Sequence, residues 1–239
     1  MEENGIWTES FRIHAYVVDK NREATIPTLC NLFQEVANNH AFNRQYDYFS
    51  MQERGMIWVL NRLNIKVLRY PKWQETLRVS TWVSLFVPFP HRHLEIVDEQ
   101  GEIVCCAYSL WFSLDSETHR PKRILDFDAP LSDKKTSCEF PQKVVYTEGV
   151  SLVSERRVVC SDLDMLGHVN NVKYTEWMLD VLPEIVGDGK PNSLEINYLG
   201  EAFINDTILF FMKKEARKIH FALRKKGENT DIIRACFEV

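Results

Sequence analysis

The sequence predicts an α+β fold in which one helix followed by four strands occurs twice. In the first half, apolar residues recur at helical spacing over 26–37, and four strand-like segments follow. In the second half, apolar residues recur at helical spacing over 174–185, and four further strand-like segments follow in the same order. The 239 residues therefore divide into halves of about 90–110 residues, enough for two small α+β units in tandem.

The predicted boundaries are 1–114 for an N-terminal domain, 115–150 for a linker and 151–239 for a C-terminal domain. Asp, Ser, Pro and Lys dominate the linker, so we expect it to cross the surface. Each unit is expected to wrap an antiparallel sheet around its helix. Two such units can bury a shared core, and we expect them to form a pseudo-dimer that imitates a two-fold homodimer.

The first half begins with a predicted strand over 10–18 and a turn over 19–22. Thr25 fits an N-cap and Pro27 fits the first turn of the following helix, which is expected to continue to about His40 or Phe42. Residues 43–55 are polar and aromatic, and we expect a short lid-like excursion there. The strands predicted to complete this half are 57–69, 76–86, 90–98 and 103–114.

The second half begins with a predicted strand over 152–160, followed by a turn and a helix. The apolar face of that helix comprises Tyr174, Trp177, Met178, Val181, Leu182 and Ile185. The strands predicted to follow are 194–203, 207–215, 218–225 and 231–239.

The composition, 45% hydrophobic and 26% charged, is typical of a globular protein. The acidic start lacks the features of a signal peptide, and no apolar run reaches the ~18 residues of a membrane span, so we expect a cytoplasmic protein. A net charge of −5 argues against general nucleic-acid binding. The six cysteines form no CxxC pair, and we expect them to be buried thiols.

Polar groups concentrate just before the second helix. Asp164 and His168 stand four residues apart and supply an acid and a base. Gly167 allows a substrate carbonyl close to the backbone, where N–H groups at a helix start, up to Val169, can polarise it. Asn170 can cap the helix or orient a water. These residues therefore predict an acid–histidine site at the start of a helix.

Two groups of residues resemble metal sites, and we expect neither to bind a metal. Asp164 lies in a pattern like a calcium loop, but Leu166 and Lys173 occupy positions that need oxygen ligands. His91 and His93 lack an acidic or thiol companion nearby. We therefore predict neither a metal nor a cofactor.

The segment 162–171, Asp-Leu-Asp-Met-Leu-Gly-His-Val-Asn-Asn, resembles the signature of acyl-[acyl-carrier-protein] thioesterases, which are built from two tandem hotdog domains. Residues 25–41 resemble the first hotdog helix of that family, and residues 58–62 and 69–76 resemble the strands after it. The resemblance covers roughly residues 6–239. It implies a hydrolase that releases free fatty acid from fatty acyl-[acyl carrier protein] and so ends chain elongation.

The resemblance also implies the catalytic residues, which are Asp164, His168 and Glu201. Leu166 departs from the family, which usually has Asn there. Either Asn170 or the backbone takes over its orienting role, or that Asn is not essential. Ala202 stands where the plant enzymes carry Cys, which argues against a thiol nucleophile at that position and favours attack by water.

The expected reaction is thioester hydrolysis. Glu201, helped by His168, activates a water, and Asp164 orients the histidine or the water. We expect the acyl chain in an apolar tunnel lined by the first-half helix and by strands near Trp58. The corresponding turn of the first half, residues 19–24, has no acid–histidine pair, so we expect no second active site there.

Three alternatives stay open: an acyl-CoA thioesterase, a hotdog dehydratase and a non-catalytic acyl-binding protein. The expected partner is an acidic acyl carrier protein, for which basic clusters within 120–123, 213–218 and 224–226 are candidate landing sites. A monomer and a homodimer both fit, because the duplication already supplies each hotdog with its partner.

Overall fold

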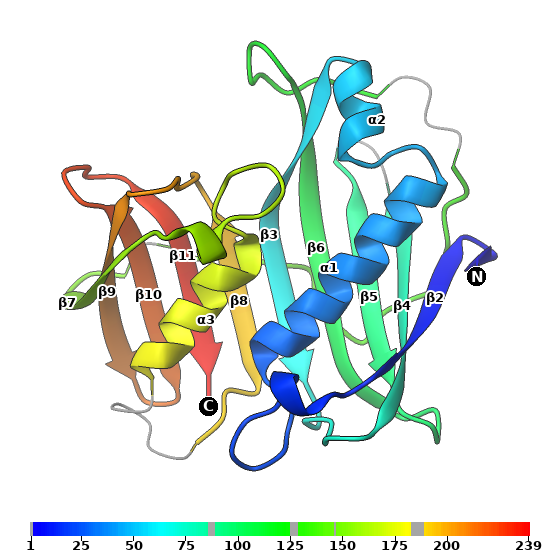
Figure 1. Ribbon diagram of the computed structural model, residues 1–239, viewed down its shortest axis with the longest axis horizontal. Coiled ribbons are helices and arrows are strands. Elements are labelled where there is room, and N and C mark those ends of the chain that lie inside the picture. The colour runs from blue at the N-terminus through cyan, green and yellow to red at the C-terminus, as the bar shows by residue number, and fades with distance from the viewer. Residues whose placement is uncertain (1, 86–88, 125–128, 146, 183–188) are drawn as a thin grey trace. The chain divides into compact units, whose positions relative to one another are not determined.

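The computed structural model describes residues 2–85, 89–124, 129–145, 147–182 and 189–239. The chain divides into two compact units, Met1–Pro141 and Gln142–Val239. Each unit has a helix lying across one face of an antiparallel sheet, as predicted (Figure 1). No helix among the described residues is long and apolar enough to cross a membrane.

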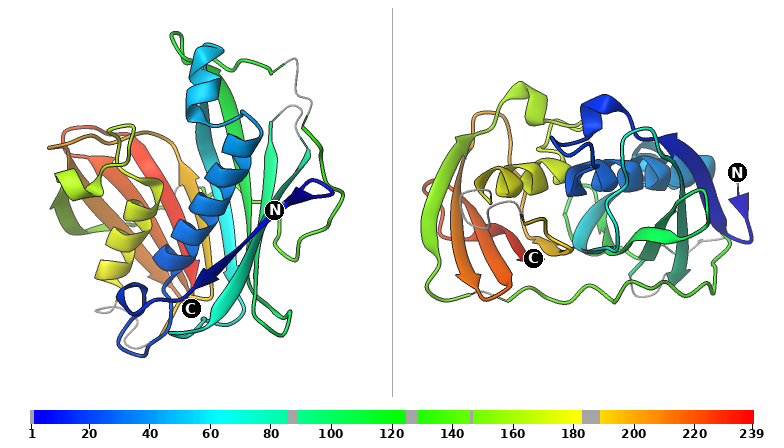
Figure 2. Two further views of the ribbon diagram at one scale, coloured as in Figure 1. Left: turned by 45° about the vertical axis from the view of Figure 1, so that its right-hand side comes forward. Right: turned by 90° about the horizontal axis from the view of Figure 1, so that it is seen from below.

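The sheet of the first unit has the strand order β1-β2-β4-β5-β6-β3, and all neighbouring strands are antiparallel. These strands are β1 Glu2–Glu3, β2 Ile6–Arg12, β3 Met56–Val67, β4 Thr76–Leu85, β5 His91–Val97 and β6 Ile103–Asp115. Figure 2 shows from two further directions that helix α1, Ile26–Asn43, lies against one face of this sheet. The four strands predicted after the helix are confirmed, although residue 86 lies outside the described residues.

Helix α1 begins where its capping residues predict. The Thr25 hydroxyl accepts a hydrogen bond from the Thr28 N–H at 3.3 Å, and Pro27 lies in the first turn. Near the other end, His40 is buried, and its Nδ1 accepts a hydrogen bond from Arg92 Nη1 at 3.1 Å. Burial, together with the charges of neighbouring arginines, lowers the pKa of His40 to about 2, so the ring is neutral.

Residues 43–55 contain a packed helix, α2, Tyr48–Glu53, in place of the expected lid-like excursion. The Asp47 carboxylate caps this helix by accepting hydrogen bonds from the Phe49 and Ser50 N–H groups at 3.0 and 3.4 Å. Met51, the buried residue of α2, joins Tyr46, Met56 and Ile124 in a buried cluster. Because this cluster is buried, α2 forms part of the core of the first unit.

The predicted linker, 115–150, spans the division between the units and includes 125–128 and 146, which lie outside the described residues. In the first unit, the Trp82 indole N–H donates to the Lys134 carbonyl at 2.9 Å, and Asn64 Nδ2 donates to the Glu139 carbonyl at 3.1 Å. These bonds attach residues 129–141 to strands β4 and β3 of the first unit.

The second unit repeats the topology of the first. Its elements are β7 Ser151–Arg157, α3 Asn171–Val181, β8 Ser193–Tyr198, β9 Thr207–Glu215, β10 Lys218–Lys225 and β11 Asp231–Glu238. The strand order is β7-β9-β10-β11-β8, again antiparallel throughout. When the strands of the two units are paired in chain order, this strand order corresponds to β2-β4-β5-β6-β3 of the first unit. The predicted duplication is therefore confirmed. Most of the predicted apolar face of α3 is buried, and Ile185 lies outside the described residues.

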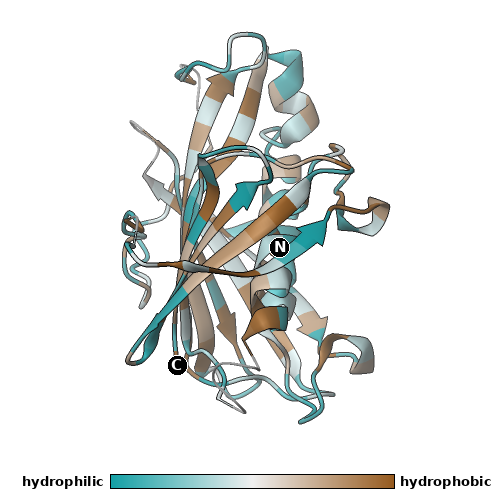
Figure 3. Ribbon diagram, turned by 90° about the vertical axis from the view of Figure 1, so that its left-hand side faces the viewer, coloured by the Kyte–Doolittle hydropathy of each residue, from teal (hydrophilic) through white to brown (hydrophobic). Residues whose placement is uncertain are grey.

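The first strand of each repeat ends earlier than predicted. Strand β2 ends at Arg12 and not near 18, and β7 ends at Arg157 and not at 160. A 3-10 turn follows shortly after each strand, Ala15–Val17 in the first unit and Cys160–Asp162 in the second. Figure 3 shows hydrophobic and hydrophilic residues interspersed along the strands, as expected when one face of a sheet is buried.

Strand β8 also ends earlier than predicted, at Tyr198 and not at 203. The N–H groups of Leu199 and Gly200 both donate to the Ile232 carbonyl, at 2.8 and 3.1 Å, which interrupts the regular ladder. Glu201 therefore lies in the loop between β8 and β9, where its side chain is not held in a sheet.

Candidate active site

The turn that precedes α3 is built around the Asp164 carboxylate. Its Oδ1 accepts hydrogen bonds from the Leu166 N–H at 2.9 Å and from the His168 N–H at 3.4 Å. The Asp164 N–H donates to the His168 carbonyl at 2.8 Å, and Gly167 has a φ of 79°, a conformation that favours glycine. Asp164 thus fixes the backbone on which His168 stands.

The first unit contains the same turn without a histidine. Asp19 Oδ1 accepts hydrogen bonds from the Asn21 N–H at 2.8 Å and from the Glu23 N–H at 3.1 Å. The Asp19 N–H donates to the Glu23 carbonyl at 2.9 Å. Asn21 corresponds to Leu166, and in both turns the backbone N–H at this position donates to the aspartate Oδ1. These bonds are therefore a property of the fold and do not by themselves mark a catalytic aspartate.

His168 and Glu201 lie next to each other. His168 Nδ1 is 3.3 Å from Glu201 Oε1, and the two side chains are 35% and 52% exposed. A carboxylate acceptor beside Nδ1 favours the tautomer that carries its proton there and leaves Nε2 unprotonated. Nε2 has no hydrogen-bond partner among the described residues. His168 Nε2 is therefore available as a base, and the Glu201 carboxylate lies at the other ring nitrogen, Nδ1.

A hydrogen bond ties the loop that carries Glu201 to the turn before α3, because the Ala202 carbonyl accepts from the Val169 N–H at 2.9 Å. Tyr174 of α3 lies near the same loop. Burial raises the pKa of Tyr174, so the phenol stays neutral. Ala202 is fully buried, so a side chain at this position faces the protein interior and not the site.

Phe203 forms a wall of the site that the sequence did not identify. Its ring meets the His168 ring edge-on, with the centroids 4.9 Å apart and the planes at 77°. The Phe203 N–H donates to Asp206 Oδ2 at 2.9 Å, and in the first unit the Lys72 N–H donates to Glu75 Oε1 at 2.8 Å. An acidic residue followed by threonine occurs at the end of this loop in both halves, as Glu75-Thr76 and Asp206-Thr207, and this repeat was the available sequence signal for the loop.

The backbone N–H groups of the predicted substrate-binding residues are already engaged. Gly167 donates to the Asp164 carbonyl at 3.1 Å, Val169 donates to Ala202, and Asn170 donates to the Asp162 carbonyl at 2.9 Å. The Asn170 side chain also caps α3 by accepting from the Val172 N–H at 2.9 Å. A substrate carbonyl would have to compete with these bonds. The Asn171 N–H, at the first position of α3, has no partner among the described residues.

Trp58, the remaining predicted substrate-binding residue, belongs to the first unit. Its indole N–H donates to the Tyr46 carbonyl at 2.7 Å, and its ring packs against the buried cluster at α2. Its place in an acyl tunnel stays a prediction.

A helix lying across an antiparallel sheet, present twice in one chain, is the architecture of tandem hotdog proteins, and here the second copy carries the His168–Glu201 contact. The chain belongs to the acyl-ACP thioesterase family. Residues 4–128 match the family's N-terminal domain, and residues 147–238 match its C-terminal domain.

Similar curated proteins include oleoyl-acyl carrier protein thioesterase 2 of Arabidopsis thaliana, which is 30% identical over 233 residues, 87% of this chain and 63% of that protein. The acyl-[acyl-carrier-protein] hydrolase FATB3 of Cuphea viscosissima is 32% identical over 196 residues, 73% of this chain and 46% of that protein. This chain thus spans about half to two thirds of the length of these plant relatives.

Solved structures show the same fold. An acyl-ACP thioesterase from Bacteroides thetaiotaomicron has a TM-score of 0.91 at 27% identity, with 98% of both chains covered. The 12:0-ACP thioesterase from Umbellularia californica has a TM-score of 0.83 at 22% identity, with 100% of this chain and 98% of that chain covered. The predicted fold class of two tandem hotdog domains is therefore confirmed.

Proposed function

We propose that this protein hydrolyses the thioester of fatty acyl-[acyl carrier protein], which releases a free fatty acid and ends chain elongation. The observation that carries the proposal is the 3.3 Å contact between His168 Nδ1 and Glu201 Oε1. The family supports a thioester as the substrate, and the names of the relatives support a carrier protein as its bearer.

In the proposed reaction, Glu201 and His168 together activate one water. Glu201 accepts the hydrogen bond from Nδ1–H and holds the ring, and the unprotonated Nε2 takes a proton from the water. The water oxygen adds to the thioester carbon, and the carbon–sulfur bond then breaks. His168 passes its proton to the departing sulfur. One thioester and one water thus give one carboxylic acid and one thiol.

Asp164 acts in this proposal as a positioning residue. Its Oδ1 holds the His168 backbone, and its Oδ2, which has no hydrogen-bond partner among the described residues, can orient the ring or the water. The Asn171 N–H, at the helix start, is the donor that we assign to the developing oxyanion. The turn around Asp19 lacks a histidine, so we propose one active site per chain.

We further propose a reducing compartment such as the cytoplasm, because the six cysteines are all free thiols and four of them are buried.

The test is thiol release by the purified protein from acyl carrier protein and from coenzyme A, loaded with the same acyl chains at equal concentrations. We expect a higher kcat/KM for the carrier substrate, and we expect His168→Ala to remove the activity while the protein stays folded. A higher kcat/KM for acyl-CoA would make coenzyme A the substrate carrier. Tight acyl binding without thiol release would make the protein a binding protein.

A further inference from the structure

Exposed apolar side chains gather around the His168–Glu201 pair. Among the described residues of the second unit, eight large hydrophobic side chains are exposed, and five of them lie in the two segments that carry this pair. We call these five the apolar rim: Val159, Met165, Leu199, Phe203 and Ile204. Met165 is 77% exposed, so most of this apolar side chain faces the solvent, which costs free energy relative to burial. Such a concentration marks an interaction surface.

The two segments of the rim are joined by hydrogen bonds and form one surface. The Val158 N–H donates to the Asp206 carbonyl at 2.8 Å, and the Asn205 N–H donates to the Val158 carbonyl at 3.1 Å. His168 and Phe203 form an isolated β-bridge, which is a further link between the two segments. The rim therefore keeps its shape when a partner binds, which lowers the entropic cost of association.

We propose that the apolar rim is the docking surface for the acyl carrier protein. This inference rests on the proposed function, because the thioester carbon must reach His168 for the reaction to occur. The body of the carrier must then lie against the residues that surround the pair, and those residues are apolar.

Lys225 and Lys226, at this end of the unit, lie beside carboxylates, and Arg157 has a neutral amide partner. Lys226 Nζ is 3.0 Å from Glu155, Lys225 Nζ is 3.6 Å from Asp206, and Arg157 Nη2 donates to Asn205 Oδ1 at 2.7 Å. The two lysines already have carboxylate neighbours, so an acidic carrier gains little from them. Docking at the rim is therefore driven mainly by apolar contact and depends weakly on salt.

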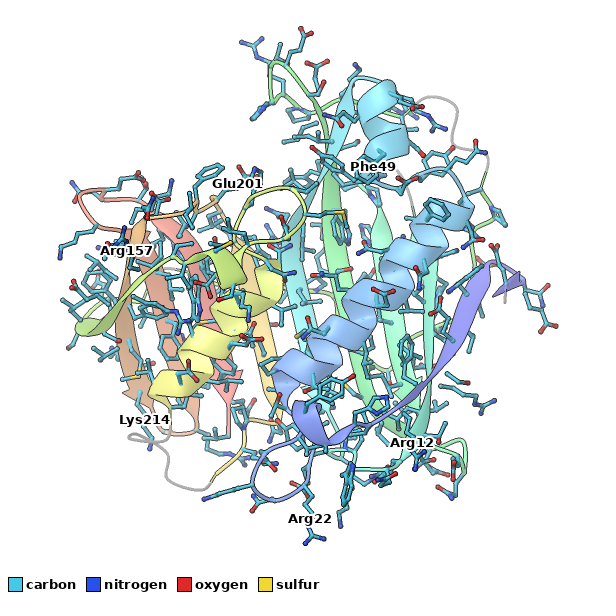
Figure 4. All side chains as sticks on the ribbon, viewed as in Figure 1. Arg12, Arg22, Phe49, Arg157, Glu201 and Lys214 are labelled. Atoms are coloured by element: carbon cyan, nitrogen blue, oxygen red, sulfur yellow. The ribbon has the colours of Figure 1, made fainter. Side chains whose placement is uncertain are left out.

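The basic cluster within 213–218 lies at the opposite end of the same sheet. Strand register pairs Ile208 with Lys225 beside the site loop, and it pairs Lys214 with Ile219 six residues further along β9. Six residues of strand span about 20 Å at about 3.3 Å each. Figure 4 shows Arg157 and Glu201 at one end of this unit and Lys214 at the other. A carrier seated on the rim leaves this cluster uncovered.

The experiment compares two double variants, Met165→Gln with Ile204→Gln at the rim and Lys213→Glu with Lys214→Glu at the far end. For each, kcat/KM is measured on acyl carrier protein and on an acyl N-acetylcysteamine thioester, which has no protein carrier. The ratio of the two values is expected to fall about tenfold in the rim variant and to change less than twofold in the lysine variant. A fall in the lysine variant alone, or an unchanged ratio in the rim variant, overturns the inference.

A direct binding measurement keeps this inference separate from the proposed function. If the wild type hydrolyses neither substrate, the proposed function has failed, and the affinity for acyl carrier protein is then compared by calorimetry in the wild type and the rim variant. Binding about tenfold weaker in the variant supports docking, and equal affinity overturns it. Anionic lipid vesicles serve as the competing surface. Loss of vesicle binding in the rim variant with unchanged carrier affinity would assign the rim to a membrane.

Discussion

Asp164 and Asp19 make the same backbone hydrogen bonds, and only one of them stands beside a histidine, so they form a matched pair for mutagenesis. Each Oδ1 accepts two backbone N–H bonds, at 2.9 and 3.4 Å for Asp164 and at 2.8 and 3.1 Å for Asp19. The net contribution of such bonds is ~1 kcal/mol each, less where water replaces them. Asp164→Ala and Asp19→Ala should therefore each lower the free energy of unfolding by about 1–2 kcal/mol.

Substitution by asparagine tests the charge of each aspartate separately from the hydrogen bonds that it accepts within the turn. The amide oxygen can accept the same two N–H bonds, so Asp164→Asn and Asp19→Asn should each cost less than about 0.5 kcal/mol. Asp164→Asn nevertheless removes the charge beside His168, and we expect kcat to fall by about 100-fold, the lower end of acid–base contributions. Asp19→Asn should leave kcat within about twofold of the wild type, because its turn has no histidine.

The assays are urea denaturation for stability and thiol release from acyl carrier protein for kcat. If Asp164→Asn keeps kcat within twofold of the wild type, the carboxylate charge takes no part in the reaction and Asp164 only builds the turn. If Asp164→Ala is destabilised and Asp19→Ala is not, the two turns are not energetically equivalent and the reasoning fails.

Three further predictions concern the pair, the helix caps and pH. Glu201→Gln should lower kcat by about 10²-fold, and combining it with His168→Ala should add little to the loss from the histidine alone, since the two act as a unit; full activity of Glu201→Gln would exclude its role. Asn170→Ala and Thr25→Ala should each destabilise the protein by about 1 kcal/mol in urea denaturation, because each removes a helix cap, and an unchanged midpoint would contradict this. The folded pKa of His40, about 2, lies below its unfolded value of about 6.5, so its contribution to stability is complete above pH 6.5 and is lost at up to about 1.4 kcal/mol per pH unit as the pH falls. His40→Gln should reduce the stability difference between pH 7 and pH 5, and an equal difference in both proteins would refute the assignment.

Local signals in the sequence were sufficient for helices α1 and α3 and for most strands. Thr25 and Asn170 cap α1 and α3, and the periodicity of the segments after them predicted four strands in each half. Helix α2 was missed although Asp47 carried an N-cap signal, because its six residues are too few to show a clear period. The end of β8 was missed because Leu199 and Gly200 share one carbonyl on β11, a contact that no local pattern encodes.

Of the three predicted catalytic residues, the structure brings the side chains of His168 and Glu201 into contact, and the catalytic roles of all three stay predictions. The spacing of Asp164 and His168 indicated a pair, whereas the contact of the imidazole is with Glu201, which the family resemblance supplied. The contact between the Phe203 and His168 rings joins two loops that are far apart in the sequence, so no local pattern predicts it. The predicted N–H donors from Gly167 to Val169 are engaged, because Gly167 and His168 bond to Asp164 within the turn and Val169 bonds to the Ala202 carbonyl of the β8–β9 loop.

The repeated aspartate turn separates what the two copies of this unit share from what differs between them. Glu23 in the first unit occupies the bridge position that His168 occupies in the second, and Lys72 occupies that of Phe203. The backbone turn thus persists in the half that has no histidine there, so its hydrogen bonds do not depend on the reaction proposed for the other half. The two units nevertheless differ in the lengths of their strands. Strands β3 and β6 of the first unit have 12 and 13 residues, against 6 and 8 in the corresponding β8 and β11 of the second unit.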